Sequence, residues 1–245
     1  MLPQPFVNLV RKSYHGHHNF SVGMGLPRKI LASCPAGVYN EAKIRKRSGS
    51  MGLEFELKYA ADDGLRQRMV RELGGDWVRT EMETIYYDTP AGDLARLRFT
   101  LRRRLENGRA VCTVKTPAGS QGRGEWECLC SRIEDAVPVL CGLGAPEELA
   151  ALTRGGLVPI CGAKFTRLSR LESIPGGQVE IALDGGLLLG GGRTAPLGEA
   201  EVELKSGTPE DAEAWAGALA ARFGLKPEKK SKFRRALALA KGEQP

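Results

Sequence analysis

The sequence predicts an α+β fold built on an antiparallel sheet, and two observations carry that prediction. Several segments alternate between apolar and charged residues, which is the period-two pattern of strands with one buried face. Segments with helix-start and helix-stop residues lie between groups of these strands. An order of many strands with helices set between the groups is typical of antiparallel α+β folds.

Eight segments are predicted as strands. The first, residues 52–59, places Leu53, Phe55 and Leu57 on one face and charged residues on the other. Residues 99–105 and 109–116 flank Asn107-Gly108, a dipeptide that strongly favours a two-residue hairpin turn. The other predicted strands are residues 84–87, 125–130, 165–173, 178–184 and 199–205.

Helices are predicted in four regions. Asp62 or Asp63 caps a helix that runs to about residue 73, where Gly74 ends it. Short helices are expected between residues 131 and 156, and Pro146 opens one of them. A third helix begins after Thr208 and ends before Gly224, and a last one covers about residues 230–241.

Residues 1–50 form a basic leader that differs from the rest of the chain. They hold eight Lys or Arg and one acid, whereas the remaining 195 residues hold 28 basic and 28 acidic side chains. Because a domain without net charge is a poor general binder of phosphate backbones, we expect no nucleic-acid partner. The leader lacks strand and helix periodicity, so we expect it to be disordered or not native, with the folded domain over residues 51–242.

Apolar runs and cysteines bear on the compartment. No apolar run approaches the ~18 residues that span a bilayer, so no membrane segment is expected. The six cysteines form no CxxC pair and support neither a zinc site nor a disulfide framework. We therefore expect reduced thiols in a cytoplasmic protein. No His follows residue 18, which excludes a His-dependent triad in the domain.

The face of the predicted strands opposite the apolar residues carries charge. Acids recur at positions i and i+2 on three strands, and pairs of bases lie on others. The acids on this face are Glu54, Glu56, Glu125, Glu127, Glu180, Asp184, Glu199, Glu201 and Glu203; the bases are Lys58, Arg102, Arg104, Lys115 and Arg167.

Two interpretations of this charged face are open. It can be a solvated sheet surface whose cross-strand ion pairs each contribute a few tenths of a kcal/mol. Paired carboxylates, however, suit a hard divalent cation that takes oxygen ligands, and grouped Arg and Lys suit a polyanion. We favour the second interpretation, which describes a site for metal-assisted phosphoryl transfer.

An ordered series of motifs runs through the domain. It consists of Glu54-Phe55-Glu56-Leu57-Lys58, Tyr86-Tyr87-Asp88-Thr89-Pro90, Leu101-Arg102-Arg103-Arg104, Thr113-Val114-Lys115, Glu125-Trp126-Glu127, Glu180-Ile181-Ala182-Leu183-Asp184, Glu199-Ala200-Glu201-Val202-Glu203, and Ser231-Lys232 followed by Arg235. The series begins with an ExExK signature and resembles the CYTH superfamily of triphosphate tunnel metalloenzymes, in particular its bacterial inorganic triphosphatase branch. The resemblance spans nearly all of residues 51–242.

The resemblance implies a closed eight-stranded antiparallel β-barrel with flanking helices and charged side chains inside. It implies Mg²⁺ or Mn²⁺ held by Glu54, Glu56, Glu201 and Glu203. It implies phosphates bound by Lys58, Arg102, Arg104, Lys115, Arg167 and Lys232, with catalytic roles for Lys58, Glu125, Glu127 and Asp184. Glu125, Glu127 and Asp184 would place a second metal and the attacking water. Lys232 lies on a predicted helix, which would have to plug or flank one mouth of the tunnel.

One position departs from the family pattern. The family commonly has a second basic residue two positions after Arg167, where this chain has Ser169. Arg170 is basic but points to the other face if the strand is regular, and only a β-bulge would bring it inside.

The function that we expect is hydrolysis of a triphosphate to a diphosphate and phosphate. Inorganic tripolyphosphate is the favoured substrate because no base-reading aromatic residue is evident inside the predicted site. Alternatives on the same scaffold are a class IV-type adenylate cyclase, a thiamine triphosphatase and a non-catalytic polyphosphate-binding module. The expected partner is a triphosphate-containing small molecule, and a homodimer is left open.

Overall fold

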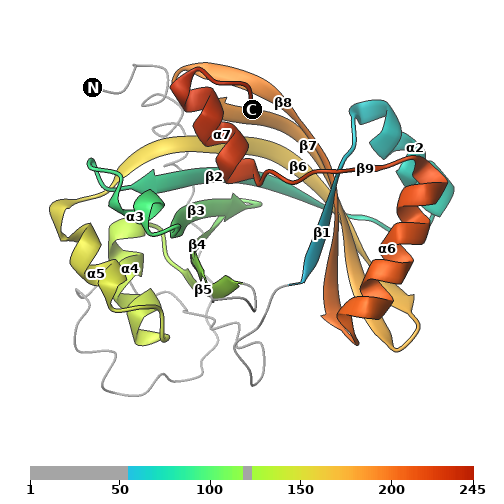
Figure 1. The fold of residues 1–245 in the computed structure, drawn as a ribbon, viewed down its shortest axis with the longest axis horizontal. Coiled ribbons are helices and arrows are strands. Elements are labelled where there is room, and N and C mark those ends of the chain that lie inside the picture. Colours follow the sequence, from blue (N-terminus) through green and yellow to red (C-terminus); the bar gives the residue numbers. More distant parts are fainter. Residues whose placement is uncertain (1–54, 118–122) are drawn as a thin grey trace.

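The computed structural model describes residues 55–117 and 123–245 and contains one antiparallel sheet with helices around it (Figure 1). The sheet has nine strands in the order β5-β4-β3-β2-β6-β7-β8-β1-β9. In chain order they are β1 (Glu56–Ala60), β2 (Val78–Asp88), β3 (Thr100–Glu106), β4 (Arg109–Pro117), β5 (Arg123–Leu129), β6 (Val158–Ile174), β7 (Gly177–Gly190), β8 (Arg193–Ser206) and β9 (Lys226–Pro227). The predicted antiparallel α+β class is therefore confirmed.

The prediction of a closed eight-stranded barrel is wrong in both closure and strand number. Within the described residues, β5 ends the sheet on one side and β9 ends it on the other. The outer edge of β1 pairs with β9 at Tyr59 and Ala60, so the edge that would meet β5 in a barrel is partly used. The two-residue β9 carries no sequence alternation, and Pro227 within it gives no strand signal.

Seven helical segments accompany the sheet along the described chain, six of them α-helical or short α-helical turns and one a 3₁₀ turn. They are α2 (Asp63–Leu73), α3 (Asp93–Arg96), α4 (Ile133–Gly142), α5 (Glu148–Leu152), η3 (Thr153–Gly155), α6 (Pro209–Phe223) and α7 (Lys232–Lys241). The predicted caps are confirmed, because Asp62 accepts from Leu65 N and Thr208 accepts from Asp211 N. Gly74 and Gly224 follow the ends of α2 and α6, as expected. The four-residue α3 was not predicted.

The hairpin between β3 and β4 follows its sequence signal. Asn107 and Gly108 both have positive φ, 49° and 82°, as a type I′ turn requires. The twist of this turn type matches the right-handed twist of the flanking strands. Asn107 also ties this turn to β2, since its Oδ1 accepts from Glu81 N at 2.8 Å. The predicted hairpin is confirmed.

Strand alternation divides the sheet into two faces. The outer face carries two apolar clusters: one packs α2 and α6 against β1, β7 and β8, and the other packs α4 and α5 against β3, β4 and β5. Figure 1 shows these helix groups at opposite ends of the curved sheet. The inner face, defined here as the face that carries Arg102, Arg167 and Glu201, lacks both groups.

Helix α7 covers part of the inner face. Its residues Ala236 and Leu239 pack against Tyr86, Phe165 and Leu188, which alternate with outer-face residues on β2, β6 and β7. Gly190 lets the helix approach closely, since an added Cβ would lie 2.4 Å from the Ala236 carbonyl oxygen. The apolar inner-face patch under α7 ends where the charged residues begin, so the helix places its first residue beside them. None of the described helices is long and apolar enough to cross a bilayer.

Candidate active site

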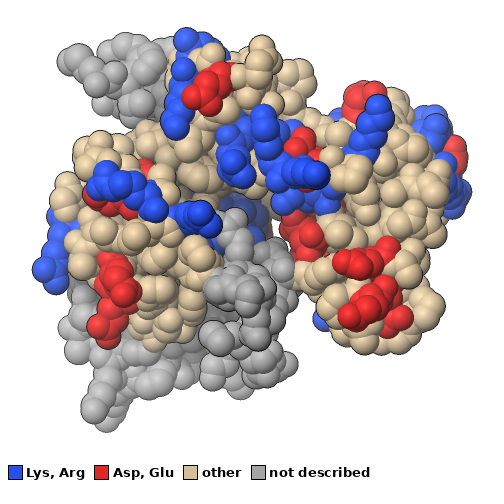
Figure 2. Space-filling view, viewed as in Figure 1, with Lys and Arg blue, Asp and Glu red and all other residues tan. Residues whose placement is uncertain are grey.

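The registers of the strands bring the predicted charged residues onto one surface. Arg167 of β6 lies opposite Asp184 of β7, which lies opposite Glu199 of β8. In the next row, Lys58 of β1 lies opposite Glu201. Figure 2 shows basic and acidic side chains meeting in the hollow between the two lobes of the molecule. The inner face is therefore the charged surface that the sequence predicts.

Three acids form a buried cluster at the centre of this face. Asp184, Glu199 and Glu201 each offer a carboxylate oxygen, and these oxygens lie within 4.8 Å of one another. Asp184 and Glu199 are fully buried and Glu201 is 7% exposed. Clustered carboxylate oxygens are the ligands that Mg²⁺ and Mn²⁺ prefer, so the donor set fits the metal that the resemblance implies.

Arg167 and Lys232 neutralise this cluster in the structure. Arg167 forms a two-pronged ion pair with Asp184, with both N–O distances at 2.7 Å, and contacts Glu201 at 2.5 Å. The Lys232 ammonium lies 2.8 Å from an Asp184 oxygen and 2.7 Å from a Glu201 oxygen, and it also contacts Glu199. The planar guanidinium fork suits such two-pronged pairing, whereas the ammonium group acts as a central point charge.

Helix α7 places two cations, Lys232 and Arg235, at the acid cluster because residues three positions apart lie on the same side of a helix. Ser231 caps the helix by accepting from Arg234 N at 3.2 Å, which fixes Lys232 as the first residue of α7. Arg235, one turn later, pairs with Glu199 and lies 3.7 Å from Glu228. The predicted position of Lys232 on a helix flanking the site agrees with this arrangement.

Burial and charge act in opposite directions on the central groups. Burial tends to raise the pKa of Glu201, but Lys232 and Arg167 lie against it and hold that pKa well below its usual range. Burial raises the pKa of Glu199, and the nearby Lys232 offsets only part of that effect. Burial tends to lower the pKa of Lys232, but the surrounding carboxylates raise it above its usual value. The ammonium is therefore held charged inside the cluster.

A second charged group comes from β3, β4 and β5. Arg102 and Lys115 both pair with Glu125, at 3.6 and 3.2 Å, and Arg104 pairs with Glu106 at 2.5 Å. Burial and the neighbouring Arg102 lower the pKa of Arg104. The Arg104 Nε is buried without a hydrogen-bond partner in the described part of the chain. Such an orphaned donor on a buried cation is a position where an anion's oxygen would fit.

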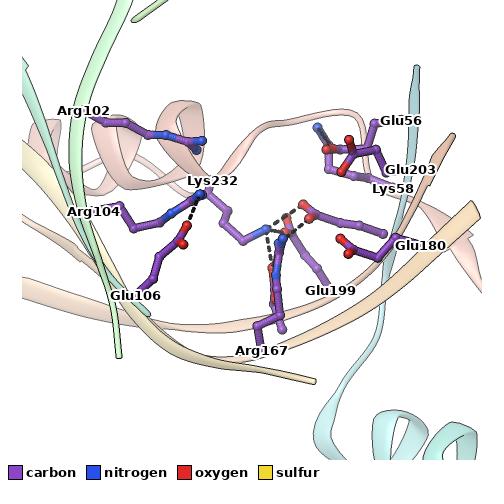
Figure 3. A network of polar contacts seen from close by, with 12 residues as sticks. Glu56, Lys58, Arg102, Arg104, Glu106, Arg167, Glu180, Glu199, Glu203 and Lys232 are labelled. Carbon is purple, nitrogen blue, oxygen red and sulfur yellow. Dashed lines mark hydrogen bonds and ion pairs between the residues drawn. The ribbon is translucent and has the colours of Figure 1, made fainter. Parts of the chain in front are cut away.

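The two groups face one another across Lys232. In Figure 3, Arg102 and Arg104 lie on one side of the Lys232 side chain, and Glu56, Lys58 and Glu203 lie on the other. The sheet curves enough to bring strands from its two halves into one site without closing. The single surface thus holds the buried acid cluster at one end and, at the other, a group of bases interleaved with Glu106 and Glu125.

The predicted metal ligands separate into two layers. Glu56 lies opposite Glu203 in the β1–β8 pairing, one row beyond Glu201. Glu56 pairs with Lys58 at 3.2 Å and Glu203 with Lys205 at 2.7 Å, and Lys205 also lies 3.4 Å from Glu180. The predicted ligand Glu54 lies outside the described residues. The described acid cluster shares Glu201 with the predicted set.

The sequence reasoning did not assign roles to Glu199, Arg235 or Lys205. Glu199 has the same strand parity as Glu201, and Arg235 is three residues after Lys232 on the helix, so both signals were available. Glu127, a predicted catalytic residue, lies on β5 opposite Thr113 and is half-buried on the inner face. Thr113 Oγ1 is buried with no hydrogen-bond partner among the described residues.

Arg170 points away from the site. The β6–β7 pairing is regular from Gly162 to Ile174, so no bulge turns Arg170 inward. Its guanidinium donates to the Leu73 and Gly74 carbonyls at the end of α2 and stacks 5.5 Å from the Trp77 ring centre. Arg170 is therefore an outer-face packing residue, and Ser169 occupies the inner position.

Comparisons with known proteins agree with these motifs. The sequence matches the CYTH domain family over residues 52–237. It is 34% identical over 133 residues to a Haemophilus influenzae protein named "Inorganic triphosphatase", a match that covers 51% of this chain and 36% of that protein. It is also 43% identical over 58 residues to an uncharacterized Mycobacterium tuberculosis protein, covering 24% of this chain and 11% of that protein. The chain thus spans about a third or less of these curated relatives.

Solved structures show the same fold at low identity. A Hippeastrum protein described as a putative adenylyl cyclase with a dominant triphosphatase activity aligns with TM-score 0.57 and 20% identity, covering 78% of this chain and 97% of that one. A Pyrococcus horikoshii OT3 protein aligns with TM-score 0.51 and 25% identity, covering 77% and 99%. Because the family match covers most of the described residues and the ordered motifs lie within it, the chain belongs to the CYTH domain family.

Proposed function

We propose that this protein is a metal-dependent triphosphatase that hydrolyses inorganic tripolyphosphate to diphosphate and phosphate. The observation that carries the proposal is the pairing of a buried acid cluster with a group of bases on one inner face, with Lys232 between them. Acids can hold a divalent cation while bases hold phosphoryl oxygens, and phosphoryl transfer requires both. The name of the Haemophilus influenzae relative supports the reaction class.

The acids are proposed as the metal site. The resemblance assigns Glu54, Glu56, Glu201 and Glu203 to Mg²⁺ or Mn²⁺, and the described cluster adds Asp184 and Glu199 as further carboxylates. A bound divalent metal would neutralise phosphate charge and lower the pKa of a water molecule. Arg167 and Lys232 then serve to hold Asp184 and Glu201 in place, because each of the two bases contacts both carboxylates.

The bases are proposed as the triphosphate site. Arg102, Arg104 and Lys115 lie on two neighbouring strands, and the unsatisfied Arg104 Nε can donate to a phosphoryl oxygen. Charge on the terminal phosphoryl group would be stabilised by donors that are already in position, which is the largest source of catalysis in such sites. Lys58, Arg167 and Lys232 are proposed to bind the rest of the chain of phosphates. Glu125 and Glu127 are proposed to orient the attacking water.

Phosphate release tests the proposal. The purified protein is assayed with tripolyphosphate, ATP and thiamine triphosphate, each with Mg²⁺, with Mn²⁺ and with a chelator. We expect metal-dependent release of phosphate, fastest from tripolyphosphate. Arg104→Gln removes a charge-assisted contact of about 1.5–3 kcal/mol, so kcat/KM should fall roughly ten- to hundredfold. Arg154→Gln, an exposed arginine on η3, is the matched control and should keep full activity.

The same assay separates the alternatives. Pyrophosphate with cyclic AMP from ATP would identify a cyclase, and preferred release from thiamine triphosphate would identify a thiamine triphosphatase. Saturable tripolyphosphate binding without turnover in either metal would identify a binding module. Full activity in both Glu56→Gln and Lys58→Met would contradict the proposed site. A cytoplasmic location and a homodimer stay predictions, and gel filtration tests the second.

A further inference from the structure

A cavity lies on the outer face of the sheet, away from the proposed active site. It has a volume of about 460 Å³ and lies between α2 and strands β2, β6 and β7. Its floor is formed by Leu168, Leu183 and Gly185, which alternate with the inner-face residues Arg167 and Asp184 on the same strands. One layer of backbone therefore separates this cavity from the charged cluster. A volume of this size suits a small organic ligand.

The lining combines an apolar floor with a basic rim. Val70 of α2 extends the apolar floor, and Arg66, Arg71 and Arg79 stand around it. The lining carries three arginines and one acid, Asp63, which leaves a net charge of +2. Arg79 also pairs with Glu81 at 2.8 Å beside the cavity, so its charge is partly balanced. Arg71, an exposed residue in the last turn of α2, makes no hydrogen bond or ion pair within the described residues, so its charge is available.

The sequence is shaped to hold Arg66 against the sheet. Gly185 and Gly198 lie opposite one another on β7 and β8, and the Arg66 guanidinium lies over this pair. A Cβ on Gly185 would lie 2.1 Å from Arg66 Nη2, and one on Gly198 would lie 2.9 Å from Nη1. Arg66 is fixed further by donating to the Ala61 carbonyl at 3.1 Å and to Asp63 at 2.9 Å. A fixed guanidinium loses little freedom on binding an anion, which favours affinity.

We propose that this cavity binds a small amphipathic organic anion, with its apolar body on Val70, Leu168 and Leu183 and its carboxylate, sulfonate or phosphate group on Arg66, Arg71 and Arg79. The apolar floor excludes a bare inorganic anion as the best-fitting ligand, since it would leave that floor uncovered. The arginine rim disfavours a neutral apolar ligand, since covering the exposed guanidinium groups of Arg71 and Arg79 with apolar atoms would remove water from these charges without replacing its hydrogen bonds. This proposal does not depend on the proposed triphosphatase activity.

Anilinonaphthalene sulfonate (ANS), an amphipathic anion whose fluorescence rises in apolar surroundings, is the probe. The full chain is titrated with ANS, and the variants Arg71→Gln and Arg79→Gln are compared with Arg154→Gln. Both rim residues are exposed, so their substitution should leave the thermal unfolding midpoint unchanged. Loss of one charge-assisted contact should weaken ANS binding about tenfold in each rim variant and not in the control.

Competition experiments fix the chemical class. Octanoate should displace ANS, whereas sulfate and tripolyphosphate at the same concentration should not. The proposal is overturned if ANS shows no saturable binding, if both rim variants bind like the wild type, or if Arg154→Gln weakens binding as much as they do. Displacement of ANS by sulfate as strong as by octanoate would overturn the amphipathic class of ligand. Displacement of ANS by tripolyphosphate would show that ANS binds at the inner face and would overturn the proposed outer-face site.

Discussion

Replacing Lys232 by Met tests whether α7 supplies the counter-charge for the buried acids. Asp184, Glu199 and Glu201 carry three negative charges, and Arg167, Lys232 and Arg235 carry three positive charges against them. The Lys232→Met variant keeps an unbranched side chain of similar helix propensity, one atom shorter, but leaves one carboxylate uncompensated. Removing one partner from a buried ion pair costs about 3–5 kcal/mol. We therefore expect the free energy of unfolding at pH 7 to fall by about that amount.

Urea unfolding in the presence of a chelator measures this loss. Lys241→Met, at the exposed end of the same helix, is the control and should lose at most about 1 kcal/mol, the size of a helix-dipole effect. Adding Mg²⁺ should restore part of the stability of Lys232→Met, because a divalent cation bound to the same carboxylates stabilises the folded state. A loss below about 1 kcal/mol without metal would refute the charge balance described here.

The pH dependence of this difference has a defined sign. Lys232 and Arg167 hold the Glu201 pKa below its usual range, so the pairing stabilises the fold above the unfolded-state value of about 4.3. That contribution is lost as pH falls toward the lower folded-state pKa. Lys232 is charged in both states at pH 7, because its folded pKa is raised above an unfolded value of about 10.4. The stability gap between wild type and Lys232→Met should therefore be widest near neutral pH and should narrow below about pH 4.

Two further predictions concern packing and thiol chemistry. Gly190→Ala would place a Cβ 2.4 Å from the Ala236 carbonyl oxygen and push α7 off the sheet, so urea unfolding should show a free energy of unfolding lower by about 1–3 kcal/mol. The control Gly217→Ala, with open space around it in α6, should raise the free energy of unfolding by roughly 0.5–1 kcal/mol. Wild-type stability for Gly190→Ala would contradict the close approach of α7. Burial raises the pKa of Cys128 and of Cys161 to about 12, so both thiols stay protonated at pH 8. Iodoacetamide at pH 8 should therefore leave both cysteines unmodified in the folded chain, as measured by peptide mass spectrometry. Rapid labelling of either cysteine would show that its strand opens.

Local sequence patterns predicted most elements because each depends on neighbouring residues. Asp62, Thr208 and the Asn107-Gly108 turn act within a few positions, and the structure confirms all three. Strand alternation also predicted which residues share the inner face, since parity does not depend on distance along the chain. It underestimated the lengths of β2, β6, β7 and β8, whose ends carry glycine, proline or mixed residues without clean alternation.

Closure of the sheet and the partners of each charge could not be read from local patterns. Barrel closure depends on how β1 meets β5, which are separated by most of the sheet, and pairing of β1 with β9 has no sequence signal. Parity placed Glu199 on the inner face but did not show that Lys232 and Arg235 from α7 would pair with it. Those contacts depend on the docking of a helix through Tyr86, Phe165 and Leu188, which is a long-range packing event.

The docking of α7 sets an order for building the charged centre during synthesis. The clustered acids Asp184, Glu199 and Glu201 leave the ribosome at least 31 residues before Lys232, the first cation that α7 contributes. Until then Arg167 is the main base beside Asp184 and Glu201, and the nascent strands carry carboxylates that oppose their own burial. The inner face can therefore reach its final packing only after the last described helix has been made.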